Sequence, residues 1–332
     1  MMRARSARLA PRQGEGDVRP VIATLGELLV EFVAEETGTG HRRPSRYAGP
    51  FPSGAPGIFI DQAGRMGARA LMAGAVGDDA FGAVVTDRLG EAGVDLRLVA
   101  RREGLPTGIA FVAYDGAGGR DFVYTIAASA APLLPSGAET VAGFREAGVE
   151  IVHVTGSSLG DPGMRAQIME TVDGSLAQGA ALSLDPNLRK ELMREAGAVE
   201  AIRALLARAA YVLPSEADAD ALWPGEPFDA WAPRLLAAGA RAVAYKKGAG
   251  GASGWTREEG PLHLPGHAVG EVDPTGAGDC FGATFVTRLA QGAPLAEALR
   301  DANAAGALAV TRLGPMEGNS DPAMIRAFLA GQ

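Results

Sequence analysis

The chain has 332 residues, of which 47% are hydrophobic, and its formal net charge is −8 at pH 7. This length supplies one large core, and no uncharged apolar run is long enough to span a bilayer, so we expect a soluble globular protein. An acidic chain is a poor candidate for nonspecific binding to nucleic acid or membranes, so backbone amides, a few cations or a metal would have to hold a polyanionic ligand locally.

The first 19 residues carry five arginines and two acidic residues. They lack the apolar segment of a secretory signal, so we expect a disordered tail ahead of one domain that spans residues 20–332. The one cysteine, Cys280, excludes an internal disulfide. A single cysteine without a disulfide partner in the chain favours a reducing, cytoplasmic compartment.

Apolar, strand-like runs alternate with Ala- and Leu-rich helical stretches along most of the chain. The predicted strands are 21–25, 70–75, 151–154, 181–184, 211–213 and 242–245, and the predicted helices are 58–66, 81–92, 164–178, 199–209 and 231–238. Such alternation predicts a parallel sheet between two layers of helices, with ligands beyond the carboxyl ends of the strands.

Two segments, near residues 35–53 and 106–127, break this alternation. The second holds two β-like runs, 108–114 and 120–126, joined by a Gly-rich turn. We expect these pieces to form a small β lid over a ligand site, although a surface hairpin without a ligand role would have the same pattern.

The most informative motif is D-P-T-G-A-G-D-C-F-G at residues 273–282, directly before a predicted helix at 281–291. The small residues Gly276, Ala277 and Gly278 let an anion approach the backbone, and amides at a helix N-terminus favour negative charge. Asp279 would repel a phosphate, so it is better explained as a base that takes a proton from an attacking hydroxyl. A simple helix-capping aspartate is the alternative.

The same string resembles the C-terminal signature of the ribokinase/phosphofructokinase-B carbohydrate kinases. Three further segments are similar to family motifs and follow in the family's order: G-A-V-G-D-D-A-F-G at 74–82, D-P-N-L-R at 185–189 and A-N-A-A-G-A at 302–307. The resemblance runs from about residue 21 to the end of the chain. It implies a ribokinase-like three-layer α/β/α fold with a mostly parallel central sheet and a small β lid.

The resemblance also implies an ATP-dependent sugar kinase that uses Mg²⁺, with a monovalent cation as a further candidate. Sugar and ATP are the expected partners, with no nucleic acid or membrane, and a homodimer is expected because lids of this type often pair. No G-x-x-x-x-G-K-[ST] loop occurs in the chain, so a Walker-type ATP site is not expected.

By resemblance, the sugar lies between the sheet and the lid. The expected sugar contacts are Glu31, Gly54, Ala55, Asp61, Tyr124 and Arg189. Glu31 stands where relatives have a sugar-binding aspartate, and a carboxylate can accept hydrogen bonds from two hydroxyls. Ser53 and Ile58 depart from the family's G-G-A-x-x-N loop, and Asp61 is expected to replace the missing asparagine.

The nucleotide is expected near the Gly-rich turn that follows Lys246. The expected nucleotide contacts are Asn187, Ser215, Lys246, Gly248, Gly251, Thr275 and Asn303. Ser215 and Asp218 stand where relatives have an N-x-x-E motif associated with Mg²⁺, and Glu216 is a second metal candidate. Mg²⁺ dehydrates reluctantly, so we expect any metal to be held through water.

Two segments bear on which sugar is used. Residues 124–130 read Y-T-I-A-A-S-A, where 2-keto-3-deoxygluconate kinases often have Y-Y-R-A-G-S-A. Ile126 would cost an acid substrate a charge-assisted hydrogen bond worth about 1.5–3 kcal/mol. The segment R-L-G-P-M-E-G at 312–318 resembles tagatose-type kinases. The sequence therefore favours a fructose- or tagatose-like ketohexose.

Three other interpretations stay open at the level of sequence. The first is a 2-keto-3-deoxygluconate kinase, with Arg120 or Arg189 meeting the carboxylate in place of the missing arginine. The second is a nucleoside kinase, which would share the base and the anion-binding turn. The third is a non-catalytic sugar or nucleotide sensor, suggested by the altered positions Ser53, Ile58, Ser215 and Asp218.

Overall fold

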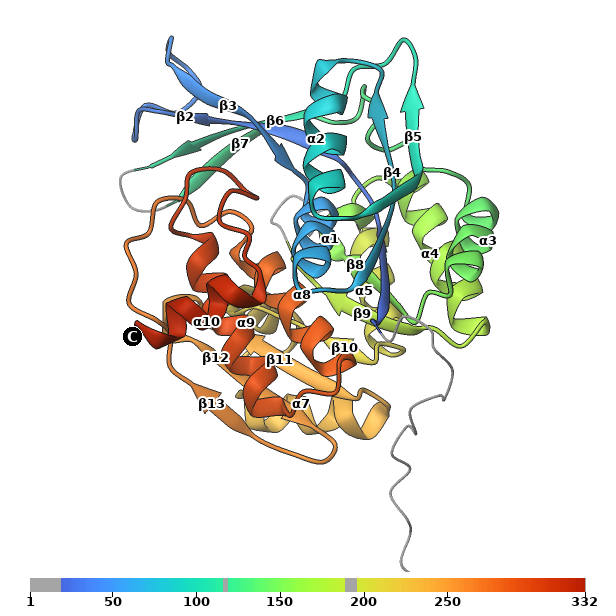
Figure 1. Cartoon of the computed structure of the whole chain (residues 1–332), viewed down its shortest axis with the longest axis vertical. Helices are drawn as coiled ribbons and strands as arrows, with labels where there is room; N and C mark the ends of the chain where they lie inside the picture. The colour runs from blue at the N-terminus through green and yellow to red at the C-terminus, as the bar shows by residue number, and fades with distance from the viewer. Residues whose placement is uncertain (1–18, 116–118, 189–195, 332) are drawn as a thin grey trace, which may run out of the picture.

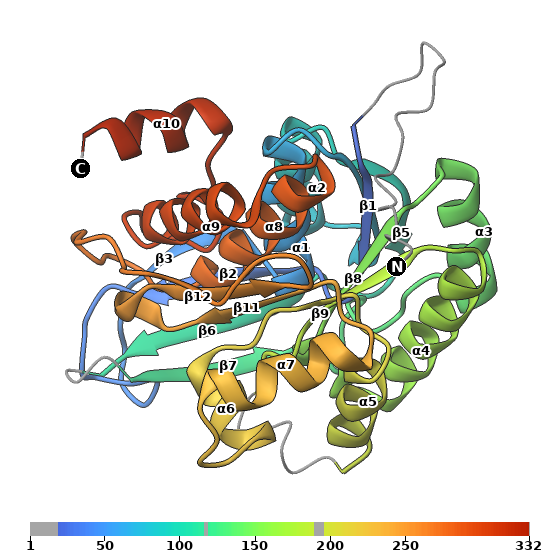
Figure 2. The same ribbon diagram turned by 90° about the horizontal axis from the view of Figure 1, so that it is seen from below.

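The computed structural model of the chain describes residues 19–115, 119–188 and 196–331. These residues form a large sheet between two layers of helices, and a smaller second sheet projects from one side (Figures 1 and 2). Of the predicted disordered tail, residues 1–19, all but Arg19 lie outside the described part. Within that part, no helix has the length and apolarity needed to cross a membrane.

The large sheet has the strand order β13-β12-β11-β10-β9-β8-β1-β4-β5. Its parallel strands are β1 (Val21–Leu25), β4 (Arg69–Gly77), β5 (Asp95–Arg102), β8 (Ile151–Thr155), β9 (Ala181–Asp185), β10 (Tyr211–Val212) and β11 (Ala242–Lys246). The strands β12 (Ala252–Thr256) and β13 (Leu262–Leu264) extend one edge in antiparallel fashion. Strands β1, β8 and β9 are buried throughout, as expected where helices cover both faces.

Alternating side chains of these strands supply two separate cores. On one face, Ile22 and Met72 pack with α1 (Ala55–Arg65), α2 (Ala80–Glu91), α8 (Ala277–Ala290) and α9 (Leu295–Ala309). On the other face, Ala23 and Leu71 pack with α3 (Gly137–Ala147), α4 (Pro162–Ala177), α5 (Ala196–Leu206), α6 (Glu216–Leu222) and α7 (Phe228–Ala238). The helix α10 (Pro322–Ala330) packs on α9. This is the three-layer arrangement that the sequence predicts.

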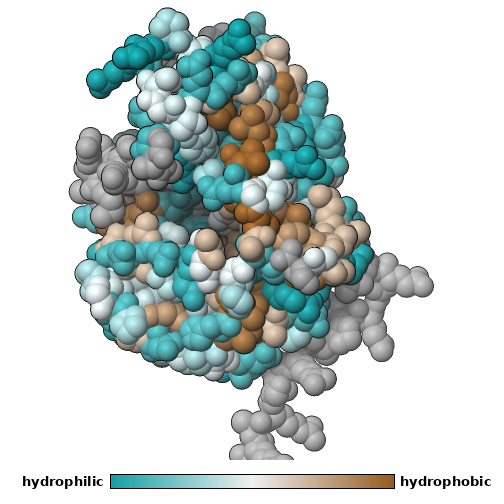
Figure 3. All heavy atoms as spheres, turned by 90° about the vertical axis from the view of Figure 1, so that its left-hand side faces the viewer, coloured by the Kyte–Doolittle hydropathy of each residue, from teal (hydrophilic) through white to brown (hydrophobic). Residues whose placement is uncertain are grey.

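The second sheet has the strand order β3-β2-β6-β7. It consists of β2 (Leu29–Ala34), β3 (Tyr47–Ser53), β6 (Gly108–Tyr114) and β7 (Arg120–Thr125). Both segments predicted to form a lid contribute strands, and β2 was not anticipated. The turn at residues 116–118 lies outside the described part. Figure 3 shows a recess on the side of the molecule where this sheet overhangs the large one.

The turn between β4 and α2 explains the spacing of the motif at 74–82. Asp79 caps α2 by accepting from Gly82 N at 2.7 Å, and it also accepts from Thr107 N at 2.8 Å and from Thr107 Oγ1 at 2.6 Å. A Cβ on Gly77 would lie 2.5 Å from Leu105 O, so only glycine fits there. Thr107 directly precedes β6, so this motif fixes the point at which the chain enters the second sheet.

Candidate active site

Polar side chains gather at the carboxyl edge of the large sheet. The strand β9 ends at Asp185 and β11 ends at Lys246, and Lys246 Nζ forms an ion pair with the Asp185 carboxylate. The two side chains are only 12% and 3% exposed, so this pair is largely withdrawn from water. Carboxyl ends of parallel strands are where open α/β sheets bind ligands.

The anion turn, defined here as residues 273–279, lies next to this ion pair. Gly276 has φ of +84°, and a Cβ there would lie 2.3 Å from Pro315 O, so the position requires glycine. The helix α8 begins at Ala277, so the amides of Ala277, Gly278 and Asp279 have no acceptor within the helix. Such amides and the helix dipole together favour an anion.

Lys246 brings a positive charge to the anion turn. A Cβ on Gly278 would lie 3.3 Å from Lys246 Nζ, which places the ammonium beside the turn. Burial would lower the pKa of Lys246, but the charges of Asp185, Asp218 and Asp279 raise it above its usual value. The ammonium therefore stays charged at neutral pH. Asp279 lies in the first turn of α8 and is 9% exposed.

Of the two predicted metal residues, Asp218 takes part in hydrogen bonds that stabilise the local fold. Asp218 Oδ2 accepts from Ser215 N at 2.7 Å and Asp218 N donates to Ser215 Oγ at 3.3 Å, which forms a capping box at the start of α6. Asp218 Oδ2 also accepts from Ser215 Oγ at 2.6 Å. Its Oδ1 accepts from Leu188 N at 2.6 Å, which fixes the loop after β9. That loop holds Asn187 at φ +37°. Both oxygens of Asp218 are thus engaged, whereas Glu216 is exposed.

A direct metal cage is also not evident elsewhere. Across residues 19–115, 119–188 and 196–331, no three His, Cys, Asp or Glu side chains cluster in a way that could hold a metal ion. Mg²⁺ commonly takes most of its oxygen ligands from water and from phosphate groups.

Two buried carboxylates flank the amino end of α1. Glu31 in β2 accepts from Ser53 Oγ at 3.2 Å, so the serine that departs from the family's glycine has a defined contact. Glu27 accepts from Ser157 Oγ at 3.1 Å and from Ser158 Oγ at 2.5 Å. Gly54 caps α1 with φ of +103°, and a Cβ there would lie 2.5 Å from Glu27 O.

The predicted sugar residues Glu31, Gly54 and Ala55 therefore lie together, where β2 and β3 meet α1. Glu27 lies beside them but was not among the predicted site residues, although a carboxylate directly after a strand and a glycine was a usable signal.

Of the remaining predicted sugar contacts, one lies on the second sheet. Glu31 pairs with Ala110, and Ala110 pairs with Tyr124, so these three side chains share a face of that sheet. Tyr124 is 49% exposed and stacks on Phe122. Arg189 lies outside the described residues.

Asp61 is engaged in a structural cluster. Its carboxylate accepts from Arg65 Nε at 2.8 Å, from Arg88 Nε at 3.1 Å and from Asn319 Nδ2 at 2.6 Å. These partners tie α1 and α2 to the loop after α9. Asp61 is fully buried. Its contacts give no support to the expectation that it replaces the missing asparagine in holding a sugar.

The same cluster contains the cysteine. Cys280 Sγ donates to Asn319 Oδ1 at 2.9 Å, and the side chain is fully buried. Burial raises the pKa of the Cys280 thiol well above its ordinary value, and the nearby Asp279 and Asp61 charges add to the effect. Cys280 is thus a packed residue beside the predicted base.

Predicted nucleotide residues lie on both sides of residues 264–266. Gly251 has φ of +92°, and a Cβ there would lie 2.2 Å from Leu264 O. Asn303 Nδ2 donates to Pro265 O at 2.6 Å from the other side. Gly248, in the same turn as Gly251, has φ of +51°. The backbone around these residues is therefore closely packed and glycine-dependent.

Thr275, another predicted nucleotide contact, belongs to the anion turn itself. Thr275 N donates to Asp273 Oδ1 at 2.9 Å inside the turn. The helix α9 also approaches the start of α8, since a Cβ on Gly306 would lie 3.3 Å from Ala277 O. Asn303 is one helical turn before Gly306, so the expected nucleotide contacts extend from the anion turn along α9.

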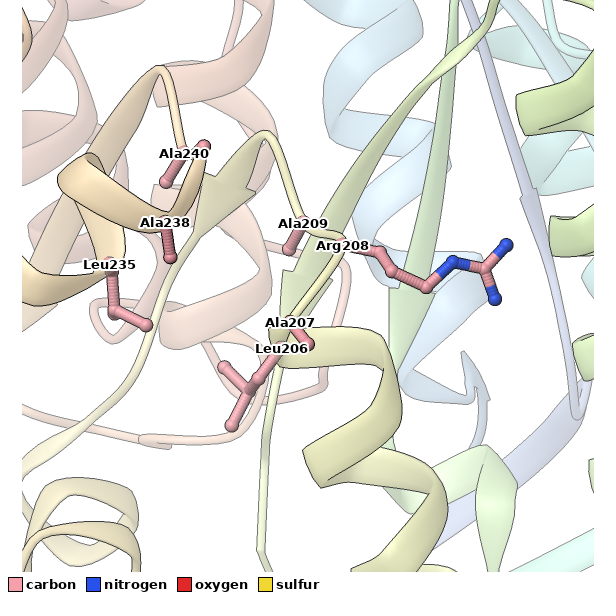
Figure 4. Close-up of a pocket in the computed structure, with 8 residues that line it drawn as sticks. Leu206, Ala207, Arg208, Ala209, Leu235, Ala238 and Ala240 are labelled. Atoms are coloured by element: carbon pink, nitrogen blue, oxygen red, sulfur yellow. The ribbon is translucent and has the colours of Figure 1, made fainter.

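A cavity outside this site lies at the opposite, amino-terminal edge of the sheet, before β10 (Figure 4). Its lining is mostly short apolar side chains, including Leu206, Ala209 and Leu235. Arg208 points away from it and pairs with Asp173 at 2.6 Å. Because no acidic, basic or nucleophilic side chain of its lining points into it, this cavity does not compete with the carboxyl edge as a candidate active site.

Comparisons with known proteins bear on the family and the fold of the chain. The profile of the pfkB family carbohydrate kinases matches residues 22–322. Among curated proteins, the chain is 28% identical over 314 residues to probable fructokinase-2 of Arabidopsis thaliana, covering 90% of this chain and 92% of that protein. It is 29% identical over 310 residues to fructokinase-2 of Solanum habrochaites, covering 89% and 91%.

Solved structures of similar proteins have the same fold. An E. coli protein provisionally called ribokinase II is 37% identical with a TM-score of 0.88, covering 94% of this chain and all of that one. A structure under that description, with ATP and Mg²⁺, is 37% identical with a TM-score of 0.87 at the same coverage. Xylella fastidiosa fructokinase with bound ATP is 26% identical with a TM-score of 0.79, covering 94% and 98%.

Proposed function

This chain belongs to the pfkB family of carbohydrate kinases, and from that premise we propose that it transfers the γ-phosphate of ATP to a hydroxyl of a neutral, fructose- or tagatose-like ketohexose. The observation that carries the proposal is Asp279 in the first turn of α8, beside three amides of the anion turn and the Lys246 ammonium. A phosphoryl acceptor site needs a base next to an anion-binding group, and this arrangement supplies both.

In the proposed mechanism, the oxygen of the sugar hydroxyl attacks the γ-phosphorus of ATP while Asp279 accepts the hydroxyl proton. The bond between the γ-phosphorus and the bridging oxygen breaks, and ADP leaves. The amides of Ala277, Gly278 and Asp279 stabilise the charge on the transferred group. Lys246, held by Asp185, supplies a fixed positive charge at the same place. Mg²⁺, when bound, would neutralise phosphate charge, and Glu216 and Asp218 are the candidates to hold it through water.

We propose that ATP binds along the edge formed by β11, α8 and α9. The proposed nucleotide contacts are Asn187, Ser215, Lys246, Gly248, Gly251, Thr275 and Asn303. The relatives with bound ATP support ATP as the donor. The glycine-dependent turn at 248–251 supports close approach of a ligand to the backbone.

We propose that the sugar binds beneath the second sheet, against Glu31, Gly54, Ala55 and Tyr124, with Glu27 added to the predicted set. Two buried carboxylates suit a polyol, because each can accept hydrogen bonds from hydroxyls. They would repel the carboxylate of a sugar acid. Ile126, which stands where sugar-acid kinases often have an arginine, also disfavours an acid substrate. The similarity to fructokinases also supports a ketohexose.

The proposal is tested by measuring ADP release with fructose, tagatose, 2-keto-3-deoxygluconate and adenosine. We expect the highest kcat/KM with a ketohexose. The Asp279→Asn variant should lose roughly 10²- to 10⁴-fold in turnover while ATP still binds. The control is Asp229→Asn, an exposed aspartate in the first turn of α7.

Each outcome of this experiment has a definite meaning. Near-normal turnover of Asp279→Asn would remove the base assignment. Sugar binding without ADP release from any sugar would favour a sensor, and preference for adenosine or for the sugar acid would replace the proposed substrate. Repeating the assay with K⁺ in place of Na⁺ tests activation by a monovalent cation.

We further propose that the enzyme acts as a homodimer in the cytoplasm. Pairing through the second sheet is supported by the exposed apolar side chain of Val123 on β7. A cytoplasmic location is supported by a single, buried cysteine.

A further inference from the structure

A buried carboxylate, Asp273, joins three separate parts of the molecule. Tyr114 Oη, at the end of β6 in the second sheet, donates to Asp273 Oδ1 at 2.5 Å. Thr275 N, in the anion turn, donates to the same oxygen at 2.9 Å. Gly314 N, in the loop between α9 and α10, donates to Oδ2 at 3.0 Å. We call these four residues the Asp273 junction.

The Tyr114 hydroxyl is held firmly as a donor in this junction. Burial and the neighbouring Asp273 carboxylate raise the pKa of Tyr114 far above its ordinary value, so the hydroxyl keeps its proton. It also lies 3.3 Å from Thr275 Oγ1. The main chain of Tyr114 is fixed as well, because its carbonyl accepts from Gly38 N at 2.8 Å. A charged acceptor makes the hydroxyl bond one of the stronger neutral-donor hydrogen bonds.

The junction is only a few residues from the proposed chemistry. Gly276 follows Asp273 by three residues, and Pro315 O, next to Gly314, stands where a side chain on Gly276 would be. The loop that carries Gly314 also abuts the second sheet, since a Cβ on Gly314 would lie 2.7 Å from Phe51 in β3. A shift of the second sheet would therefore be passed through Asp273 to the amides of the anion turn.

We propose that Tyr114 is a positioning residue whose hydroxyl, through Asp273, holds the anion turn in its phosphate-accepting geometry when the second sheet is seated on the main body. This inference rests on the proposed kinase function. It adds that the rate of phosphoryl transfer depends on the position of the second sheet, the lid. Phosphoryl transfer would then be fast only with the lid closed over a sugar, which limits transfer to water in its absence.

The test compares Tyr114→Phe with a matched control, Tyr47→Phe. Tyr47 belongs to the same sheet, but its hydroxyl bonds His41 at 3.0 Å within the lid region instead of reaching the large domain. Tyr114→Phe should lower kcat roughly 10- to 100-fold, as expected for loss of a hydrogen bond to a charged group. The affinity for ATP should change less than about threefold, and Tyr47→Phe should keep wild-type kcat.

Two further measurements separate positioning from simple stabilisation. Amide hydrogen exchange should show that sugar binding protects residues 273–279 in the wild type but much less in Tyr114→Phe. The double variant Tyr114→Phe with Asp273→Asn should lose little more kcat than Asp273→Asn alone, because the charged acceptor of the Tyr114 hydroxyl is already lost in the single variant.

Several results would overturn the inference. A Tyr114→Phe kcat within twofold of wild type would do so, as would an equal loss in Tyr47→Phe or strictly additive losses in the double variant. Unchanged protection of residues 273–279 in Tyr114→Phe would also oppose it. A wild-type protein that phosphorylates no sugar would instead overturn the proposed function, and the inference with it.

Discussion

At the scale of single residues, the ion pair between Lys246 and Asp185 is the feature with the largest expected energetic consequence. Both groups are largely buried, and Asp185 also binds Asn187 N at 3.2 Å. Removing one partner of a buried pair leaves the other charge uncompensated, which typically costs about 3–5 kcal/mol. Lys246 also lies beside the anion turn, so a change at this side chain should affect both the stability of the fold and the rate of catalysis.

We therefore predict that Lys246→Met lowers the free energy of unfolding by about 3–5 kcal/mol and also lowers kcat. Urea denaturation and the ADP assay measure the two effects. Lys247→Met, at the neighbouring position, is the control and should change both much less. Equal unfolding free energies for the two variants would show that the ion pair is not important for stability.

The pH dependence of this effect follows from the direction of the pKa shift. The pKa of Lys246 is raised in the folded protein by the three nearby carboxylates, against the effect of burial. Its stabilising contribution is thus fully present below the unfolded value of about 10.5 and is lost as pH rises through the folded pKa. The stability difference between wild type and Lys246→Met should persist from pH 7 to about pH 10. A difference that vanishes by pH 9 would contradict this.

At the scale of elements, the turn between β4 and α2 controls where the second sheet begins. Asp79 caps α2 and holds both polar groups of Thr107 ahead of β6. Burial would raise the pKa of Asp79, but the hydrogen bonds from Thr107 and the α2 amides lower it below its usual value. Its contribution to stability is present above about pH 4 and is lost as pH falls through the lower, folded pKa.

We predict that Asp79→Ala destabilises the protein by about 2 kcal/mol at pH 7, because a helix cap and the Thr107 contacts are lost together. The difference should shrink below about pH 4. The control Asp321→Ala removes the cap of α10. Asp321 accepts only the local bonds from Ala323 N and Met324 N that the structure shows for it, so this change should leave hydrogen exchange in β6 unchanged. Increased exchange in β6 for both variants would contradict the assigned role of Asp79.

Sequence patterns predicted the elements with continuous apolar runs. The range 21–25 coincides with β1, and 242–245 covers all but the last residue of β11. The strand β2 was missed because Glu31 interrupts its apolar run, and that charge is tolerated through contacts that only the folded sheet provides. The contacts of Asp61 could not be predicted for a related reason, since its partners Arg88 and Asn319 are distant in sequence.

At the scale of the whole molecule, β7 is the outermost strand on one side of the second sheet. Side chains alternate along this strand, so Val123 lies on the face opposite Tyr124, and it is 44% exposed. Phe111 is its partner across the strand pair, so an apolar surface continues onto β6. Exposed apolar surface on an edge strand is a common site of pairing between chains.

We predict that Val123→Lys converts the proposed homodimer to a monomer, because a charge would have to be buried in the interface. Sedimentation velocity measures the change. Met324→Lys is the control, since Met324 is 47% exposed on α10, away from the second sheet. A wild-type monomer, or a dimer that survives Val123→Lys, would contradict pairing through this surface.

The burial of Cys280 has a practical consequence for watching the enzyme work. The chain has one cysteine, and that thiol is fully buried and hydrogen bonded to Asn319. A thiol-directed dye should therefore label the native protein only where a new cysteine is introduced on the surface. Two such surface cysteines, one on β7 and one on α10, could carry a donor and an acceptor dye. Energy transfer between the dyes in solution would then report each movement of the second sheet relative to the main body during turnover.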